Sequence, residues 1–173
     1  FWLLFWLFCW LKGPLILLSR KHYGFVKRLF ESEIPELADG TIELYAVIRE
    51  AGIRSKVAVF STNEKVDAIG ACIGERGSRI GNILKELNGE KVDLVEYSED
   101  PSQFIQNALS PAKNTIVNIV DEEKKEALAI VPEDQLSLAI GKEGQNVRLA
   151  AKLTGFKIDI KSETQIKNEI LEI

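Results

Sequence analysis

Hydrophobic positions recur with two different periods along this chain, and their order predicts a mixed set of helices and strands. Apolar residues at helical spacing over 23–30 predict a helix, and alternating apolar residues over 42–48 predict a strand with one buried face. Residues 56–61 have the composition of an antiparallel return strand. Residues 61–64 have the pattern of a capping box, which predicts that the next helix begins there.

Glycines divide the following helical stretch into two short helices. The first helix is expected to end at Gly74, and the second is expected to start just after Gly77. A strand is expected at 91–97, and a short polar segment at 98–102 comes after it. The same order then returns, with predicted elements at 104–109, 115–120, 127–131, 132–140, 147–153 and 157–161.

The second half repeats the first at a nearly constant distance along the sequence. Residues 73–77 align with residues 140–144 at an offset of 67, and residues 87–94 align with residues 153–160 at an offset of 66. Two copies with so long a period indicate a duplicated domain and not a solenoid. We therefore divide the chain into an aberrant apolar segment, a first domain with its leading helix, a second domain and a tail, at residues 1–12, 13–98, 99–164 and 165–173.

The N-terminal apolar run, Phe1 to Leu11, lies outside this pattern. It is shorter than the roughly 20 apolar residues that cross a bilayer, and it lacks the basic start and cleavage site of a secretory signal. Our first interpretation is an artefact of gene prediction or fragment assembly, and our second is a membrane anchor or signal-like segment. The sequence contains no methionine, which is expected of a fragment or a processed chain.

Composition and charge narrow the functional classes. The chain is 46% hydrophobic and 28% charged, which is typical of a globular protein, and its net charge is −4. Binding to nucleic acid would therefore depend on a local basic face. Cys9, Cys72 and His22 have no metal-ligand or disulfide spacing, so we expect no metal and no cofactor. A reducing, cytoplasmic setting fits this cysteine usage best.

The two Gly-x-x-Gly segments are the strongest candidates for a binding site. Glycines have no side chain, so a sugar-phosphate backbone can lie against the main chain, and the helix that follows presents its free N–H groups and dipole to phosphates. A single Gly-x-x-Gly is more often a simple turn, but here two diverged halves repeat it in the same context. The cations in or just after the loops are candidates for phosphate contacts, against the alternative of a solvated surface: Arg76, Arg79, Lys142 and Arg148.

Apolar and amide side chains beside the loops complete the candidate site. Ile73 and Ile140 are expected to border an apolar groove for bases, with plain core packing as the alternative. Gln145 and Asn146 can read base edges or cap a helix. The predicted RNA-binding residues are Ile73, Gly74, Glu75, Arg76, Gly77 and Arg79 in the first half, and Ile140, Gly141, Lys142, Glu143, Gly144, Gln145, Asn146 and Arg148 in the second.

Several runs resemble the NusA family of bacterial transcription factors. The most specific run is 134–150, and residues 98–101 and 107–112 are also similar to the family. The resemblance implies an α+β fold of two tandem prokaryotic-type (type II) KH domains, each a three-stranded sheet packed by helices. It also implies that the two loops contact RNA. The family usually has a basic or apolar residue in place of Glu75, so the resemblance implies that the first loop is the weaker RNA contact. Tryptophan is common in the family where Phe156 stands.

The function implied by this resemblance is binding of single-stranded, nascent RNA in transcription elongation, termination and antitermination. The implied partners of the full-length protein are the RNA polymerase elongation complex and other antitermination factors. No catalytic residue is expected, and membrane association is not favoured. The alternatives are a KH-type module of another RNA-processing or ribosome-associated protein, a nuclease-associated subunit, and a membrane-tethered interaction domain.

Overall fold

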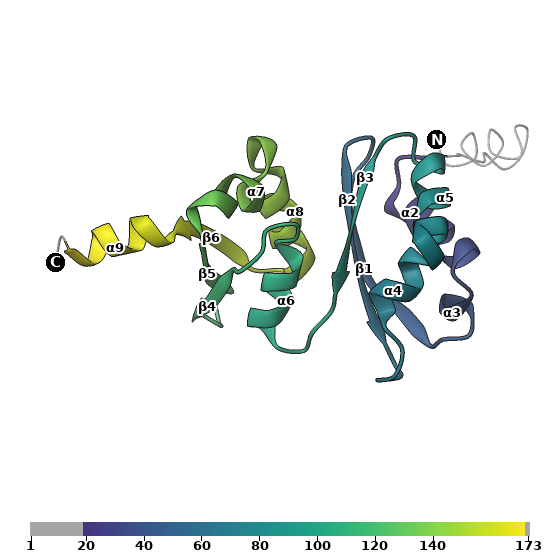
Figure 1. Ribbon diagram of the computed structural model, residues 1–173, viewed down its shortest axis with the longest axis horizontal. Coiled ribbons are helices and arrows are strands. Elements are labelled where there is room, and N and C mark those ends of the chain that lie inside the picture. The colour runs from purple at the N-terminus through teal and green to yellow at the C-terminus, as the bar shows by residue number, and fades with distance from the viewer. Residues whose placement is uncertain (1–18, 172–173) are drawn as a thin grey trace, which may run out of the picture.

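The computed structural model describes residues 19–171, which form two domains of the same topology (Figure 1). The first domain contains α2 (Tyr23–Glu33), α3 (Pro35–Ala38), β1 (Ile42–Glu50), β2 (Arg54–Ser61), α4 (Ala68–Ile73), a 3-10 turn (Glu75–Gly77), α5 (Ser78–Glu86) and β3 (Lys91–Glu96). The second contains α6 (Pro101–Ala108), β4 (Ile116–Asp121), β5 (Glu126–Val131), a 3-10 turn (Glu133–Gln135), α7 (Leu136–Ile140), a 3-10 turn (Lys142–Gly144), α8 (Gln145–Thr154), β6 (Lys157–Ser162) and α9 (Glu163–Leu171).

Both sheets have three strands and the same mixed pairing. The order is β1-β2-β3 in one sheet and β4-β5-β6 in the other. The first two strands of each sheet are antiparallel, and the third runs parallel to the second. The parallel strand requires a crossover, which the two helices on either side of each Gly-x-x-Gly loop provide. The predicted α+β class with two three-stranded domains is confirmed.

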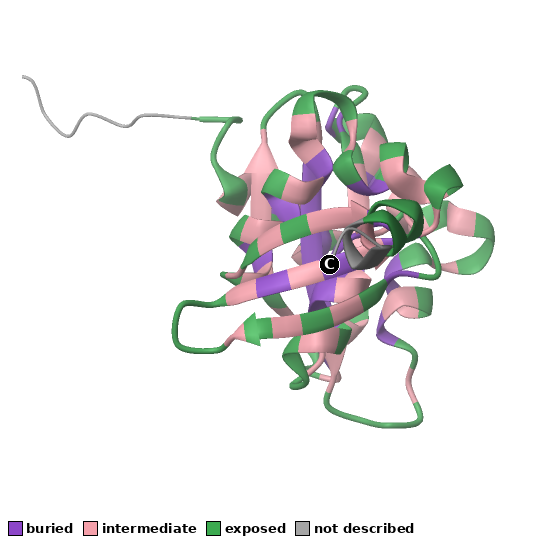
Figure 2. Cartoon of the chain, turned by 90° about the vertical axis from the view of Figure 1, so that its left-hand side faces the viewer, coloured by how far each residue is buried: buried purple, intermediate pink, exposed green. Residues whose placement is uncertain are grey.

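Helices α6 and α8 of the second domain lie between the two sheets (Figure 1). One face of the first sheet packs against α2, α4 and α5, around a core that contains Phe30 and Ile83. On the opposite face, Ala58 and Val95 belong to a second core, together with Phe104 of α6. The domains therefore share apolar packing and form one stack. Viewed from the α9 end, exposed residues follow the loops and α9, and buried residues lie within the stack (Figure 2).

Strand β1 departs from the predicted pattern because it contains a β-bulge. The pairing register with β2 shifts between Leu44 and Ala46. Ile42 and Leu44 pack into the first core, whereas Ala46 and Ile48 pack into the core shared with the second domain. The prediction that alternate residues over 42–48 share one face is wrong, because the bulge inserts Tyr45 and reverses the alternation. Both faces of this strand are covered.

The helix predicted to begin at residues 61–64 begins later. Helix α4 starts at Ala68, and the Asp67 carboxylate accepts a hydrogen bond of 3.0 Å from the backbone N–H of Ile69. Ser61 instead forms a local turn, in which its hydroxyl accepts from the N–H of Asn63 at 3.2 Å. A short hydroxyl side chain can satisfy a turn as well as a helix start, so the capping-box pattern misplaces this boundary.

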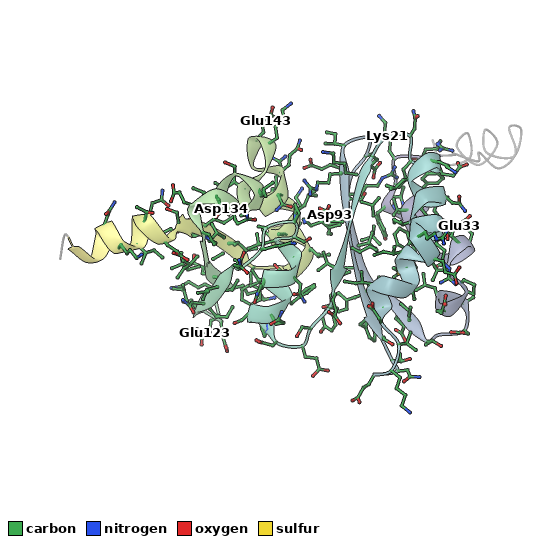
Figure 3. All side chains as sticks on the ribbon, in the orientation of Figure 1. Lys21, Glu33, Asp93, Glu123, Asp134 and Glu143 are labelled. Atoms are coloured by element: carbon green, nitrogen blue, oxygen red, sulfur yellow. The ribbon has the colours of Figure 1, made fainter. Side chains whose placement is uncertain are left out.

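Polar bonds join the two domains beside the shared core. The Lys56 ammonium is fully buried and donates to the carbonyl oxygen of Ser110 at 2.9 Å and to Asp93 at 3.1 Å. Burial lowers the pKa of the Lys56 amine, and the Asp93 charge opposes that shift. Asp93 lies at the junction of the domains in Figure 3. The Asn107 amide donates to the Glu96 carbonyl at 3.0 Å.

The C-terminal helix α9 begins directly after β6 with a reciprocal cap. The Ser162 N–H donates to the Gln165 side chain at 2.9 Å, and the Gln165 N–H donates to the Ser162 hydroxyl at 3.2 Å. No helix within residues 19–171 is long and apolar enough to cross a membrane. The apolar segment 1–12 lies outside the described residues.

Candidate nucleic-acid interface

The two Gly-x-x-Gly loops have the same backbone conformation. The first glycines, Gly74 and Gly141, have φ/ψ of 73°/174° and 75°/171°. The last glycines, Gly77 and Gly144, have φ/ψ of 76°/19° and 71°/16°. The side chains between them differ completely. The duplication has therefore kept a backbone shape, and glycine serves it because both positions need a positive φ.

The third residue of each loop is strained in the same way. Arg76 has φ/ψ of 53°/26° and Glu143 has 54°/27°, both in the left-handed region. Such a conformation costs a non-glycine residue about 1–2 kcal/mol. The Glu143 side chain lies at the outer tip of its loop (Figure 3). Strain that is repeated in both copies is typical of a functional loop.

The two glycines of each loop have different structural roles. A Cβ on Gly141 would lie 2.8 Å from the backbone nitrogen of Asn146, and a Cβ on Gly74 would lie 2.7 Å from the Cγ of Arg79. The first glycine is therefore needed for the close approach of the following helix. A Cβ on Gly144 would meet no atom closer than 4.0 Å. The last glycine is thus not crowded by other atoms of the fold, and a ligand backbone can approach it.

The helix that follows each loop begins without a side-chain cap. Gly77 and Gly144 are the N-cap residues of α5 and α8, and neither position provides a side-chain hydrogen bond to the first turn. The first N–H groups of a helix have no intrahelical partner, and the helix dipole places partial positive charge there. These two helix starts are therefore suited to binding an anionic group such as a phosphate.

Arg79 and Asn146 occupy equivalent positions and hold the preceding helix in place. Arg79 donates to the Ala71 carbonyl at 2.8 Å and forms a 2.7 Å ion pair with Glu36. The Asn146 amide donates to the Leu138 carbonyl at 3.1 Å, at the position that corresponds to Ala71. It also donates to the Leu109 and Ala139 carbonyls.

Complete burial of Asn146 corrects the expectation that it reads base edges. Its side chain has no exposed surface, and its amide points toward backbone carbonyls in the interior. The geometry favours the alternative interpretation, a capping and positioning role. Arg79 is also directed inward, because Glu36 pairs with its charge. No local sequence pattern predicts the role of Glu36, since 43 residues separate it from Arg79.

The remaining cations differ in how free their charges are. Arg76 and Lys142 are exposed, and neither forms an ion pair with another residue in the described range 19–171. Arg148 forms a 3.1 Å ion pair with Glu50 of the first domain. The order of charge is reversed between the loops, with Glu75 before Arg76 and Lys142 before Glu143. Each loop therefore presents one cation that is available to a phosphate.

The apolar residues before the loops reach the surface. Ile73 is 38% exposed and Ile140 is 37% exposed, which argues against the alternative of plain core packing. Gln145 is half-buried and borders a cleft together with Gly141 and Lys142. The structure therefore brings an apolar and a basic side chain together at each loop, and adds the Gln145 amide at the second. This combination suits the stacking and phosphate contacts of single-stranded nucleic acid.

Metal-ligating and thiol side chains occur within the described residues. Residues 19–171 contain no cluster of three or more metal-ligating side chains. Cys72 is buried, and burial raises the pKa of its thiol to about 11, which keeps it protonated at neutral pH. The thiol is therefore unsuited to nucleophilic attack.

Comparisons with known proteins assign both domains to one family. The NusA-like first KH domain matches residues 20–97, and the NusA-like second KH domain matches residues 101–168. The chain is 60% identical over 154 residues to the transcription termination/antitermination protein NusA of Halalkalibacterium halodurans, which covers 89% of this chain and 40% of that protein. The protein of the same name from Bacillus subtilis is 58% identical over 156 residues, which covers 90% and 42%.

A third relative agrees with this assignment, and a solved structure has a similar fold. The NusA protein of Mycobacterium tuberculosis is 55% identical over 152 residues, which covers 88% of this chain and 44% of that protein. The chain thus spans about two fifths of the length of these relatives. The crystal structure of APE1850 has a TM-score of 0.56 and 25% identity, and covers 79% of this chain and 96% of that chain. The chain belongs to the NusA family and contains its first and second KH domains in tandem.

Proposed function

We propose that this chain binds single-stranded RNA through both loops, Gly74–Gly77 and Gly141–Gly144. In the whole protein, the two domains serve as the RNA-binding part of a bacterial factor for transcription elongation, termination and antitermination. The partners are nascent RNA, the RNA polymerase elongation complex and other antitermination factors, in the cytoplasm. The mechanism is binding without a catalytic step.

The observation that carries this proposal is the identical backbone of the two loops in otherwise diverged sequences. Each loop presents an uncrowded last glycine, an uncapped helix start and one exposed cation. The RNA backbone lies against Gly77 or Gly144, with phosphates near the helix start and near Arg76 or Lys142. Bases rest on the apolar surface of Ile73 and Ile140.

Because the two domains are fixed relative to each other, together they bind one extended RNA strand more tightly than a single loop does. Buried packing and the Lys56–Ser110 hydrogen bond hold both loops in one body. Once one loop holds RNA, the other meets the same strand at a high effective concentration. Affinity for a long strand should therefore exceed affinity for a strand that reaches only one loop.

A titration with matched glycine variants tests the proposal. Fluorescence anisotropy of a labelled single-stranded RNA is measured with the wild type, Gly77→Asp and Gly144→Asp. The controls are Gly89→Asp and Gly155→Asp, which add the same charge at positive-φ glycines with no atom within 4 Å of an added Cβ. Each loop variant should lose about tenfold or more in affinity, because one of two linked contacts is removed.

Thermal melts of all four variants verify that the fold is kept. The control variants should bind RNA as tightly as the wild type does. Wild-type affinity in both loop variants, with both proteins folded, would rule the loops out as the binding site. Affinity for RNA should also fall as salt rises, since cations that contact phosphates release counterions.

A further inference from the structure

A cleft of about 340 Å³ separates the second loop from the first domain. Gly141 and Lys142 of the second loop line one side of it. Ile53, in the turn between β1 and β2, and Lys91, at the start of β3, line the other side. The volume is at the lower end of the range for ligand-binding clefts. The first domain thus contributes surface directly beside the second loop.

Two large apolar side chains in this cleft are unusually exposed. Ile53 is 51% exposed and Leu138 is 47% exposed, and they come from different domains. Both are held close to solvent, while the shared core nearby is fully buried. Exposed apolar groups on two walls of one cleft indicate a binding surface. Unstacked bases are ligands that suit such a surface.

Positive charge is available on both sides of the same cleft. Lys91 and Lys142 are exposed, and neither forms an ion pair with any residue in the described part of the chain. Arg54 also lines the cleft, but Asp93 accepts two hydrogen bonds from it, at 2.6 and 3.0 Å. The two lysines are therefore the cations that can meet phosphates on either side of a strand.

Hydrogen bonds connect the wall from the first domain to helix α8 of the second. The Lys91 N–H donates to the Ile53 carbonyl at 3.1 Å, and the Ile53 N–H donates to the Glu50 carbonyl at 3.0 Å. Glu50 in turn accepts a 3.1 Å hydrogen bond from Arg148 of α8. The turn and the second loop are thus connected through α8, and the cleft has a defined width. A preformed cleft costs less ordering entropy on binding.

We propose that the first domain completes the RNA site of the second loop. A strand held at Gly141–Gly144 continues across the cleft, with a base between Ile53 and Leu138 and a phosphate at Lys91. The second domain is then an incomplete binding site without the β1–β2 turn. This inference rests on the proposed function of the second loop and adds residues outside either Gly-x-x-Gly segment.

The test uses the full chain with Gly77→Asp, so that binding depends on the second loop. Affinity for a labelled single-stranded RNA is measured at several salt concentrations, with and without Lys91→Ala or Ile53→Ala. Lys91→Ala should weaken binding and reduce the slope of log affinity against log salt by about 0.7, the value for one phosphate contact on a single strand. Ile53→Ala should weaken binding about fivefold with an unchanged slope, because it removes apolar contact and no charge.

Two further variants make the result specific to the cleft. Lys91→Arg keeps the charge and should keep the wild-type slope. Lys65 lies in the loop after the C-terminal end of β2, whereas Ile53 lies just before its N-terminal end. Lys65→Ala should therefore leave both RNA affinity and its salt slope unchanged. A slope lost with Lys65→Ala as much as with Lys91→Ala would overturn the inference.

The outcomes separate this inference from the proposed function. If Gly144→Asp keeps full RNA affinity, the second loop is not the site and both statements fail. If Gly144→Asp loses affinity while Lys91→Ala and Ile53→Ala retain the parental affinity and slope, the proposed function stands and the inference is wrong. The cleft would then accommodate another ligand, such as a protein segment.

Discussion

Replacement of Asn146 by alanine distinguishes a positioning role from an RNA-reading role for this residue. The Asn146 amide has two hydrogens, and three carbonyl oxygens lie 3.0–3.1 Å from its nitrogen. These carbonyls belong to α7 and to the residue just after α6. Asn146→Ala therefore disconnects the start of α8 from two other segments and should lower the stability of the second domain.

The magnitude follows from the hydrogen bonds that are lost. Two buried bonds contribute about 1 kcal/mol each, and carbonyls left without a partner add a penalty. The Asn146 Oδ1 has no hydrogen-bond partner in the described structure, so its removal offsets part of this penalty. A net loss of about 2–3 kcal/mol is expected, which lowers the melting temperature by about 5–10 °C in a protein of this size.

Thermal unfolding, monitored by circular dichroism, measures the change in melting temperature. A titration with RNA measures the affinity of the folded variant. Gln145→Ala is the matched control, because its half-buried side chain makes no hydrogen bond to a described residue and its loss should leave the melting temperature unchanged. Asn146→Asp should destabilise more than alanine does, since a carboxylate would face the three carbonyls. An unchanged melting temperature in Asn146→Ala, combined with loss of RNA binding, would refute the reasoning.

Three further predictions concern the loop, the domain junction and pH. Gly144→Ala should cost about 1 kcal/mol of stability, from its positive φ alone. Gly141→Ala should cost far more, because its added Cβ would also clash with the backbone nitrogen of Asn146. Melting temperatures of the two variants check this difference. Lys56→Met should cost about 2 kcal/mol in chemical denaturation, since it removes the buried hydrogen bonds to Asp93 and to the Ser110 carbonyl while Asp93 keeps Arg54 as a partner. Burial raises the pKa of the Glu90 carboxyl, but hydrogen bonds from Arg49 and other donors outweigh it and lower the pKa overall. Stability from Glu90 should thus be present above pH about 4.5 and be lost as pH falls through the lowered pKa, and Glu90→Gln should flatten this dependence of denaturation on pH.

The parts of the fold that were predicted correctly depend on short-range patterns. The helix–glycine–helix–strand order is visible in sequence because periodicity and glycine position are local properties. The bulge at Tyr45 is not visible, because alternation continues in the sequence on both sides of it. Its consequence, burial of both faces of β1, depends on the second domain, which the local pattern does not contain.

In the candidate site, too, local sequence features are predictable and contacts between distant residues are not. The glycines and cations of the loops are candidates that residue type and spacing predict without the structure. The amide of Asn146 can bind base edges or cap a helix, and residue type alone does not choose between them; here it donates to carbonyls from α7 and from the end of α6. The pairing of Arg79 with Glu36 and the proximity of Ile53 to the second loop are tertiary contacts between distant residues. No local pattern contains them.

The position of α6 and α8 between the two sheets makes the duplicated domains non-equivalent. The first domain presents the back of its sheet to its neighbour, whereas the second leaves Ile116 and Val120 of its outer strand 58% and 65% exposed. Separation of the halves at residue 98 would uncover Ala58 and Val95 of the first half and the facing sides of α6 and α8 of the second. The unit that resists proteolysis and folds cooperatively should therefore be the pair, and reversal of the order of the two halves should yield a less soluble protein.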